Sequence, residues 1–510
     1  MLDARTTPKS NQLAIALMVI SAAFRLFFAA VIPLGNDEVY YWDWGRDPRL
    51  SYFDHPPGVS WLSAGAQQIF GESTGGLQAR GLVPLLHFVS SLILFKVYID
   101  LAGRRRTQTG DATFIAITQL IPAFGIGGLL LLPDAGLLLF SSAGLFITLA
   151  IARHPRSQGL LYALGSGLIA GLAGLFKYHA APIFGGMFLG LAAAKNWMVL
   201  QSKAFWTTLI LTGLTVTLPV WIWNMQHGMA SLSFQANRGI SGAEIDLPRA
   251  LRTLIGEIFF LTPGFFSLLI LSITKLWRHR TEIPQRIILW ASLPLLALIH
   301  LTMLYKEVLP HWGLPAFWLL IPEAAVLAGQ TWSTKKLRLH LLFAAAITAV
   351  ILTVTSIPSV RTQLVTRANG YPGALGEFTF WNDFSKSPQL RDLRERLSTV
   401  LSQRKILSPT PADCPGAPIL ASFRWFTTAQ LAWSLPDRPM VRSFEPGKKY
   451  YYYDRDGGAP GKGCPILAIG EKAHVEPDEI QTRMDVFLSG DMVDERYLDR
   501  PISWWLGYLK

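Results

Sequence analysis

Asp37 and Glu38 are adjacent carboxylates that directly follow the first long apolar stretch, in the segment Asn36–Trp44 (NDEVYYWDW). A carboxylate within hydrogen-bonding reach of a substrate hydroxyl can remove its proton as a general base. Neighbouring side chains point apart in both helices and strands, so we expect only one of the two to serve as the base. Glu38 could instead bind a cation or accept backbone hydrogen bonds.

Aromatic and imidazole side chains surround these carboxylates. Tyr41 and Trp44 follow them closely, and Tyr52 precedes the segment Asp54–Pro57 (DHPP), which contains His55. Aromatic residues in such a place are typical of a membrane-interface belt and equally of a platform for a sugar ring. Both interpretations stay open at this point.

Later polar junctions between apolar stretches supply the remaining candidates. Asp134 follows such a junction, where it can cap a helix, because the helix dipole favours a negative charge at the N-terminus. Lys177 can contact an anion or extend its ammonium to the lipid headgroups. The other candidate substrate-binding residues are Tyr178, His227, Arg238, Lys306, His311 and Trp312.

The elements that must hold these residues lie mostly in a membrane. The chain has 510 residues, of which 51% are hydrophobic and 16% are charged, whereas a soluble protein usually has about 25% charged residues. Charged residues make up about 12% of positions 1–357 and about 25% of positions 358–510. We therefore expect a multi-pass α-helical membrane domain over 1–357 and a water-soluble domain over 358–510.

Apolar runs near the roughly 20 residues that cross a bilayer recur through the first domain. They predict eleven spans, at 12–33, 81–101, 112–132, 135–151, 159–176, 180–195, 205–223, 253–274, 286–304, 312–330 and 339–357. Seventeen Lys and Arg residues lie on one set of loops and eight on the other, which places the N-terminus in the cytoplasm and the C-terminal domain outside. Acidic residues gather on the outer loops, which points to an outward-facing site.

Positions 358–510 alternate short apolar runs with polar stretches, which predicts a small mixed α/β domain. The apolar runs are 418–422, 449–453 and 465–470, and a helix-like stretch covers 388–405. Both cysteines of the chain, Cys414 and Cys464, fall in this domain. A pair confined to an extracytoplasmic domain indicates a disulfide, with two unpaired thiols as the alternative.

Together these segments resemble the GT-C glycosyltransferases that use polyprenyl-phosphate sugars, a superfamily that includes the protein O-mannosyltransferases and the lipid A aminoarabinose transferases. Asp37-Glu38-x-x-Tyr41 and Tyr52-x-x-His55-Pro56-Pro57 are similar to the first extracytoplasmic loop of that group. The similarity to the bacterial branch continues at 132–135, 174–178, 223–227, His311-Trp312 with Pro315-Ala316, and at Ser231, Phe234 and Gln235. The aminoarabinose transferases have Glu-Lys before the Pro-Pro pair, where this chain has Asp54-His55.

The resemblance implies an inverting transfer of a sugar from an undecaprenyl-type phosphate carrier to an envelope lipid or glycan, outside a bacterial cytoplasmic membrane. It assigns Asp37 as the base and Asp134 as a carboxylate that orients the base or pairs with a cation. A phosphate leaving group needs charge stabilisation, so cations should converge on it. The candidates are Lys177, Lys306, Arg238, Arg46 and His55. The sequence does not identify which sugar is transferred. Nor does it identify the acceptor, for which lipid A, core oligosaccharide, another glycan and protein are the alternatives.

The sequence assigns no cofactor, but it leaves room for a divalent cation. Glu38 and His227 are the candidate ligands, together with Asp54 and His55, because hard cations bind oxygen and zinc accepts histidine with carboxylate. No HxxxH or CxxC spacing supports a metal.

A transporter or flippase of a lipid-linked intermediate is the alternative function, because outer acidic residues also suit ion-coupled transport. Against it, no internal repeat is detectable and the acidic groups gather at one membrane face. The net charge of +12 would suggest a nucleic-acid partner in a soluble protein. Ten of these charges belong to positions 1–357, mostly on the cytoplasmic loops, so we expect a membrane partner and no nucleic acid.

Overall fold

The computed structural model describes residues 8–71, 74–153, 159–193, 202–240, 244–367, single positions between 380 and 399, 419–444, 463–492 and 501–510. The chain divides into two compact units. The first comprises Met1–Ala30 and Arg49–Ile351, and the second comprises Val31–Pro48 and Leu352–Lys510. A short segment from the N-terminal part of the sequence therefore folds together with the C-terminal domain.

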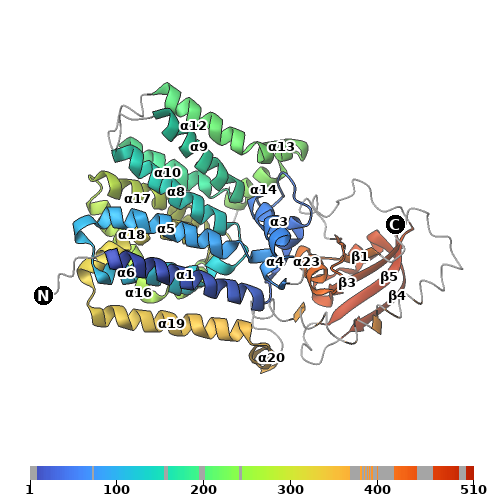
Figure 1. Ribbon diagram of the computed structural model, residues 1–510. Coiled ribbons are helices and arrows are strands. Elements are labelled where there is room, and N and C mark those ends of the chain that lie inside the picture. The colour runs from blue at the N-terminus through green and yellow to red at the C-terminus, as the bar shows by residue number, and fades with distance from the viewer. Residues whose placement is uncertain are drawn as a thin grey trace. The chain divides into compact units, whose positions relative to one another are not determined.

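The first unit consists of helices, many of which lie side by side in Figure 1. Apolar residues dominate them, as lipid requires, and a helix satisfies its own backbone hydrogen bonds there. The helices are α1 (Pro8–Val31), α3 (Gly58–Phe70), α4 (Leu77–Arg80), α5 (Val83–Ala102), α6 (Gln108–Ile115), α7 (Pro122–Gly125), α8 (Asp134–Arg153), α9 (Gly159–Phe176), α10 (Ala180–Ala193), α12 (Lys203–Val216), α13 (Leu218–Gln226), α14 (Ala230–Ile240), α15 (Leu247–Leu261), α16 (Pro263–Arg278), α17 (Ile283–Thr302), α18 (Leu314–Thr331) and α19 (Thr334–Ser356).

Each predicted span corresponds to a helix or to a bent pair of helices. Among the described residues, seven helices are long and apolar enough to cross a membrane, or up to ten if each of three bent pairs is one span. The predicted span at 180–195 is α10, which is shorter, with 14 residues. The multi-pass helical architecture is confirmed.

α15 and α16 form a corner in place of the straight span predicted at 253–274. The two helices meet at an angle of 101°. Thr262, between them, has a φ of 58°, in the left-handed region that non-glycine residues rarely adopt. Pro263 begins α16 and lacks the N–H that a continued α15 would need, so the chain turns here.

Ion pairs gather at two groups of helix ends in the first unit. The group that we call the Arg106 end pairs Arg106 with Asp111 and Arg153 with Asp100, and Lys275, near the end of α16, reaches Glu323 in the middle of α18; each distance is 2.8 Å. The group that we call the Asp134 end contains the start of α8 and the end of α9, joined by the pair Lys177–Asp134. α18 runs through the core, and every residue from Leu314 to Val326 is buried.

The second unit contains a mixed five-stranded sheet in the order β2-β1-β3-β5-β4. β1 (Ile419–Ser422) is parallel to β2 (Val441–Ser443) and β3 (Pro465–Glu471), and β5 (Ile502–Leu509) is antiparallel to β3 and to β4 (Met484–Met492). The predicted apolar runs at 418–422 and 465–470 are β1 and β3, and the mixed α/β domain is confirmed. The run at 449–453 lies outside the described residues.

The helices of the second unit are α2 (Asn36–Gly45), α20 (Pro358–Arg367), α23 (Trp425–Ser434) and α24 (Pro477–Arg483). α2 is the segment that carries the paired carboxylates. The described residues of the predicted stretch 388–405, such as Leu390 and Leu393, are helical.

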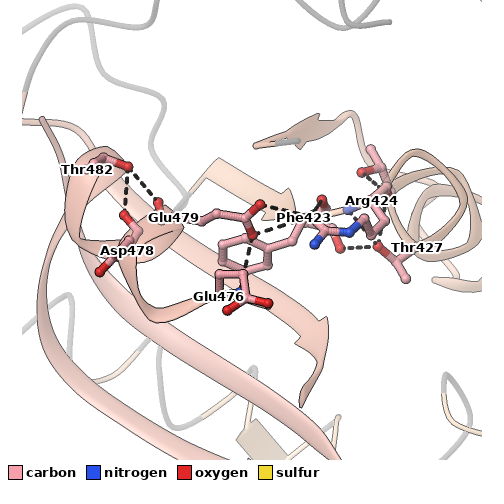
Figure 2. A network of polar contacts seen from close by, with 9 residues as sticks. Phe423, Arg424, Thr427, Glu476, Asp478, Glu479 and Thr482 are labelled. Carbon is pink, nitrogen blue, oxygen red and sulfur yellow. Dashed lines mark hydrogen bonds and ion pairs between the residues drawn. The ribbon is translucent and has the colours of Figure 1, made fainter. Parts of the chain in front are cut away.

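Arg424 fixes the point where α23 begins (Figure 2). Its guanidinium donates to both carboxylate oxygens of Glu479 on α24, at 3.0 and 3.3 Å, and to the Phe423 carbonyl at 2.8 Å. The Thr427 hydroxyl donates to the Arg424 carbonyl at 2.9 Å. Because hydrogen bonds to charged groups are the stronger ones, this network ties α23 firmly to α24.

Candidate active site

Asp134 and Lys177 form a largely buried ion pair. Asp134 is the first residue of α8, and Lys177 directly follows the last residue of α9. The Lys177 ammonium donates to both carboxylate oxygens, at 2.9 and 2.8 Å, and only 7% of its side chain is exposed. Asp134 also lies at a helix N-terminus, where the dipole stabilises a negative charge. The carboxylate thus starts a helix and pairs with a cation.

Two histidines flank this pair, His179 and His311, and both interact electrostatically with Asp134 and Lys177. Burial, with the Lys177 ammonium, lowers the pKa of His179 to about 3. Burial lowers the pKa of His311 to about 4. Both rings are therefore neutral at neutral pH and can donate or accept a hydrogen bond. The Trp312 ring meets the His179 ring edge-on, with the centroids 6.3 Å apart.

Tyr178 connects this cluster to α14. Its hydroxyl lies 2.8 Å from the Ser231 hydroxyl, and burial raises its pKa, so the phenol is neutral. α14 also contacts the segment 51–55: the rings of Phe53 and Phe234 lie 4.6 Å apart, and the Gln235 amide donates to the Asp54 carbonyl at 2.6 Å. Three segments far apart in the sequence therefore meet beside the ion pair.

Tyr52 braces the loop that contains Asp54 and His55. It is 1% exposed, its hydroxyl lies 2.6 Å from the Ser60 hydroxyl, and it accepts the Arg49 N–H at 2.9 Å. The Tyr52 N–H donates to the His55 carbonyl at 3.2 Å. His55 also interacts electrostatically with His179, so the loop brings this imidazole near the cluster.

Sequence reasoning missed a second pair near the α17–α18 connection. The His300 ring on α17 lies 2.9 Å from the Glu257 carboxylate of α15, and Glu257 is 4% exposed. An ionisable residue inside an apolar stretch was the available signal. The connection that follows α17 carries Lys306, His311 and Trp312.

The predicted base, Asp37, lies in the first turn of α2 and is half-buried. Glu38 is 3% exposed. Its carboxylate accepts the Gly35 N–H at 3.1 Å, and this hydrogen bond caps the N-terminus of α2. Accepting a backbone hydrogen bond is one of the two roles left open for Glu38. The buried Tyr41 ring packs against Tyr40 and Trp44, with centroids 5.9 and 5.2 Å away.

His227 and Arg238 are the remaining residues predicted to contact substrate. The His227 ring stacks on Trp223 at 4.2 Å, and the side chain of Arg238, on α14, lies outside the described part of the chain. Glu38 and His227 belong to different units. Over the residues that the structure describes, no group of three or more His, Cys, Asp or Glu side chains could hold a metal ion.

Cys464 precedes β3, is fully buried and takes part in a disulfide. Cys414 is the chain's only other cysteine and lies outside the described residues. The pairing of the two stays a prediction.

Comparison with known proteins relates the chain to membrane sugar transferases. Residues 54–223 match the family described as dolichyl-phosphate-mannose-protein mannosyltransferase. The chain is 24% identical over 282 residues to the lipid A galacturonosyltransferase RgtD of Rhizobium johnstonii. The matched part covers 55% of this chain and 58% of RgtD, little more than half of each protein.

Solved structures show the fold. ArnT from Cupriavidus metallidurans in the apo state superposes with a TM-score of 0.57 at 12% identity, over 96% of this chain and 97% of ArnT. The same protein bound to undecaprenyl phosphate superposes with a TM-score of 0.59 at 13% identity, over 98% of each chain. At this level of identity the likeness concerns the fold alone, and it extends over both units.

Proposed function

We propose, from the premise that this chain belongs to the GT-C superfamily of membrane glycosyltransferases, that it moves a sugar from a polyprenyl-phosphate carrier to lipid A or a related envelope acceptor. The observation that carries the proposal is the 24% identity over 282 residues to a lipid A galacturonosyltransferase, and the fold shared with ArnT bound to undecaprenyl phosphate supports the lipid carrier. The similarity to a lipid A galacturonosyltransferase supports the acceptor class.

Asp37 acts as the general base in this proposal. The acceptor hydroxyl oxygen attacks the anomeric carbon while Asp37 takes up its proton. A new carbon–oxygen bond forms as the bond between the anomeric carbon and the phosphate oxygen breaks, and the electron pair of that bond leaves with the polyprenyl phosphate. Attack from the side opposite the phosphate inverts the anomeric configuration. Glu38 holds the start of the helix that carries the base.

The departing phosphate needs positive charge and hydrogen-bond donors. An ammonium has three N–H donors, and Lys177 uses two of them on Asp134, which leaves one for a phosphate oxygen. Lys306 and Arg238 are the other candidate cations. Arg46 is less suited, because its guanidinium donates to Asp43 and to the carbonyls of Arg438 and Pro439. We assign contacts with sugar hydroxyls to His179 and His311, because neutral imidazoles can donate or accept a hydrogen bond without adding charge.

The orientation in the membrane follows from the distribution of basic residues. The Arg106 end carries Arg106, Arg153 and Lys275, and an excess of Lys and Arg is typical of cytoplasmic loops. We place this end in the cytoplasm, and the Asp134 end and the C-terminal domain on the outer, periplasmic side of a bacterial inner membrane.

Mass spectrometry of envelope lipids and glycans tests the proposed function. Cells that make the wild-type protein should contain a lipid A species heavier by one sugar residue. Cells without the protein, and cells with Asp37→Asn at equal abundance, should lack this species. If no envelope lipid or glycan differed in mass between these cells, the proposal would be wrong.

A further inference from the structure

The helix that carries Asp37, α2, is too short to be stable on its own. α2 has 10 residues, and isolated helices shorter than about 12–15 residues are marginal in water. It must be fixed by tertiary contacts, and α23 and the turn that follows it supply several of them.

A buried hydrogen bond holds the start of α2. The amide of Gln430, on α23, donates to the side-chain oxygen of Asn36 at 2.9 Å. Gln430 is 2% exposed, and a buried amide without a partner is costly, so this bond fixes the relative position of the two side chains. Asn36 directly precedes Asp37. The Tyr40 ring, on the next turn, lies 4.8 Å from the Trp425 ring of α23.

An aromatic and cationic clamp holds the end of α2. The Trp42 and Trp433 rings meet edge-on at 4.9 Å, and the Arg438 guanidinium lies 5.3 Å from the Trp42 ring and 3.9 Å from the Trp433 ring. Arg46, which directly follows α2, donates to the Arg438 carbonyl at 2.8 Å. Such cation–aromatic contacts add to the stability that ring burial provides.

The turn that supplies these contacts is itself strained. Arg438 has a φ of 41°, in the left-handed region. A non-glycine residue persists there only when its surroundings determine its conformation, and such residues concentrate at functional sites. The turn therefore presents the Arg438 carbonyl and guanidinium to α2 in a fixed arrangement.

We propose that the C-terminal domain positions the base-bearing helix, with Gln430 as a positioning residue that acts on Asp37 through Asn36. This proposal rests on the proposed function, in which Asp37 is the base. The role of the domain is then to set where the carboxylate stands relative to the acceptor hydroxyl. A displacement of about 1 Å at a reacting group can lower the rate about a hundredfold.

Steady-state kinetics of the full-length protein test the proposal. The probes are undecaprenyl-phosphate-linked galacturonic acid and undecaprenyl-phosphate-linked aminoarabinose, each with lipid A as acceptor. The variants are Gln430→Met, which keeps the size of the side chain and removes the donor, Asn36→Ala on the other side of the bond, and the double variant. Thr428→Val is the matched control: Thr428 is fully buried on the same helix, and its hydroxyl donates to the carbonyl of Arg424, directly before α23, and not to α2.

Gln430→Met and Asn36→Ala should each lower kcat about 10- to 100-fold, with KM for the donor within about twofold of wild type. The double variant should be no slower than the slower single variant, because both remove one bond. Thr428→Val should keep the wild-type kcat. Unchanged kcat in both single variants, multiplied losses in the double variant, or a kcat loss in Thr428→Val as large as in Gln430→Met would overturn the proposal.

Asp37→Asn, measured in parallel, separates the two hypotheses. If Asp37→Asn turned over normally, the assignment of Asp37 as the base would fail and the positioning role with it. If Asp37→Asn were inactive while Gln430→Met matched wild type, only the positioning role would fail.

Discussion

The ammonium of Lys177 donates to both carboxylate oxygens of Asp134, at 2.9 and 2.8 Å, across 43 positions of sequence. The pair joins the start of α8 to the end of α9 at the place where two neutral histidines also lie. Because the pair is buried, removing either partner should destabilise the protein, since the other charge would be left buried without an opposite charge beside it.

Asp134→Asn or Lys177→Met should therefore destabilise the protein by about 3–5 kcal/mol. Replacing both residues, in Asp134→Leu with Lys177→Met, should restore most of the stability and leave transfer activity lost. Thermal unfolding in detergent, alongside the transfer assay, measures both. Lys96→Met is the control, because Lys96 is 57% exposed in its pair with Asp100, and exposed pairs contribute about 0–1 kcal/mol. Equal unfolding temperatures in single and double variants would contradict the expectation.

The two adjacent carboxylates on α2 should respond differently to amide substitution. Asp37→Asn removes the proposed base and should lower kcat by about 10²–10⁴-fold. Glu38→Gln keeps a side-chain oxygen that can accept the Gly35 N–H, so it should retain most of the activity and nearly all of the stability. Kinetics at matched protein concentration distinguish the two variants, and equal losses would show that the roles are wrongly assigned.

The buried histidines predict a dependence of stability on pH. The pKa of His311 falls from 6.5 to about 4 in the folded protein, so the unfolded chain binds the proton more readily. The contribution of the neutral His311 ring to the free energy of unfolding is complete above pH 6.5. It is lost as the pH falls toward 4, by up to about 1.4 kcal/mol per pH unit. The free energy of unfolding should fall less steeply between pH 7 and pH 5 in His311→Gln than in wild type.

His279→Gln serves as the control for this measurement, because His279 is half exposed at the end of α16. It should keep the wild-type slope. A slope for His311→Gln as steep as that of wild type would mean that the imidazole does not stay neutral in the folded state.

The Arg424–Glu479 pair predicts how firmly α23 is held. Glu479→Ala removes both hydrogen bonds to the guanidinium and should cost about 1–3 kcal/mol. Hydrogen exchange of the α23 amides should accelerate accordingly. Lys472→Ala, which breaks the exposed pair with Asp491, should leave these amides unchanged. Equal exchange rates in the two variants would argue against the network as an anchor of α23.

The long helices could be predicted from the sequence because an apolar run of about 20 residues is a local property. The corner at Thr262 was missed, although Pro263 marks it in the sequence, because the apolar residues on both sides of it resemble one continuous span. Several residues of the candidate site could also be predicted from the sequence: Lys177, Asp134 and His311 are candidates by residue type and position alone.

The contact partners of the site residues could not be predicted from the sequence, because a contact between distant segments leaves no local sequence pattern. Nothing in the sequence around Gln430 indicates that it bonds with Asn36, and no periodicity reveals that His300 faces Glu257. The assignment of α2 to the same unit as the C-terminal domain belongs to this class of information.

The bond between Asn36 and Gln430 spans 394 positions. A ribosome adding about 5–20 residues per second makes these two residues about 20–80 seconds apart. Throughout that interval the nascent chain carries Asp37 on a helix whose support has not yet been synthesised. If the C-terminal domain positions Asp37 as we propose, prematurely terminated products would insert their hydrophobic segments and still lack transfer activity.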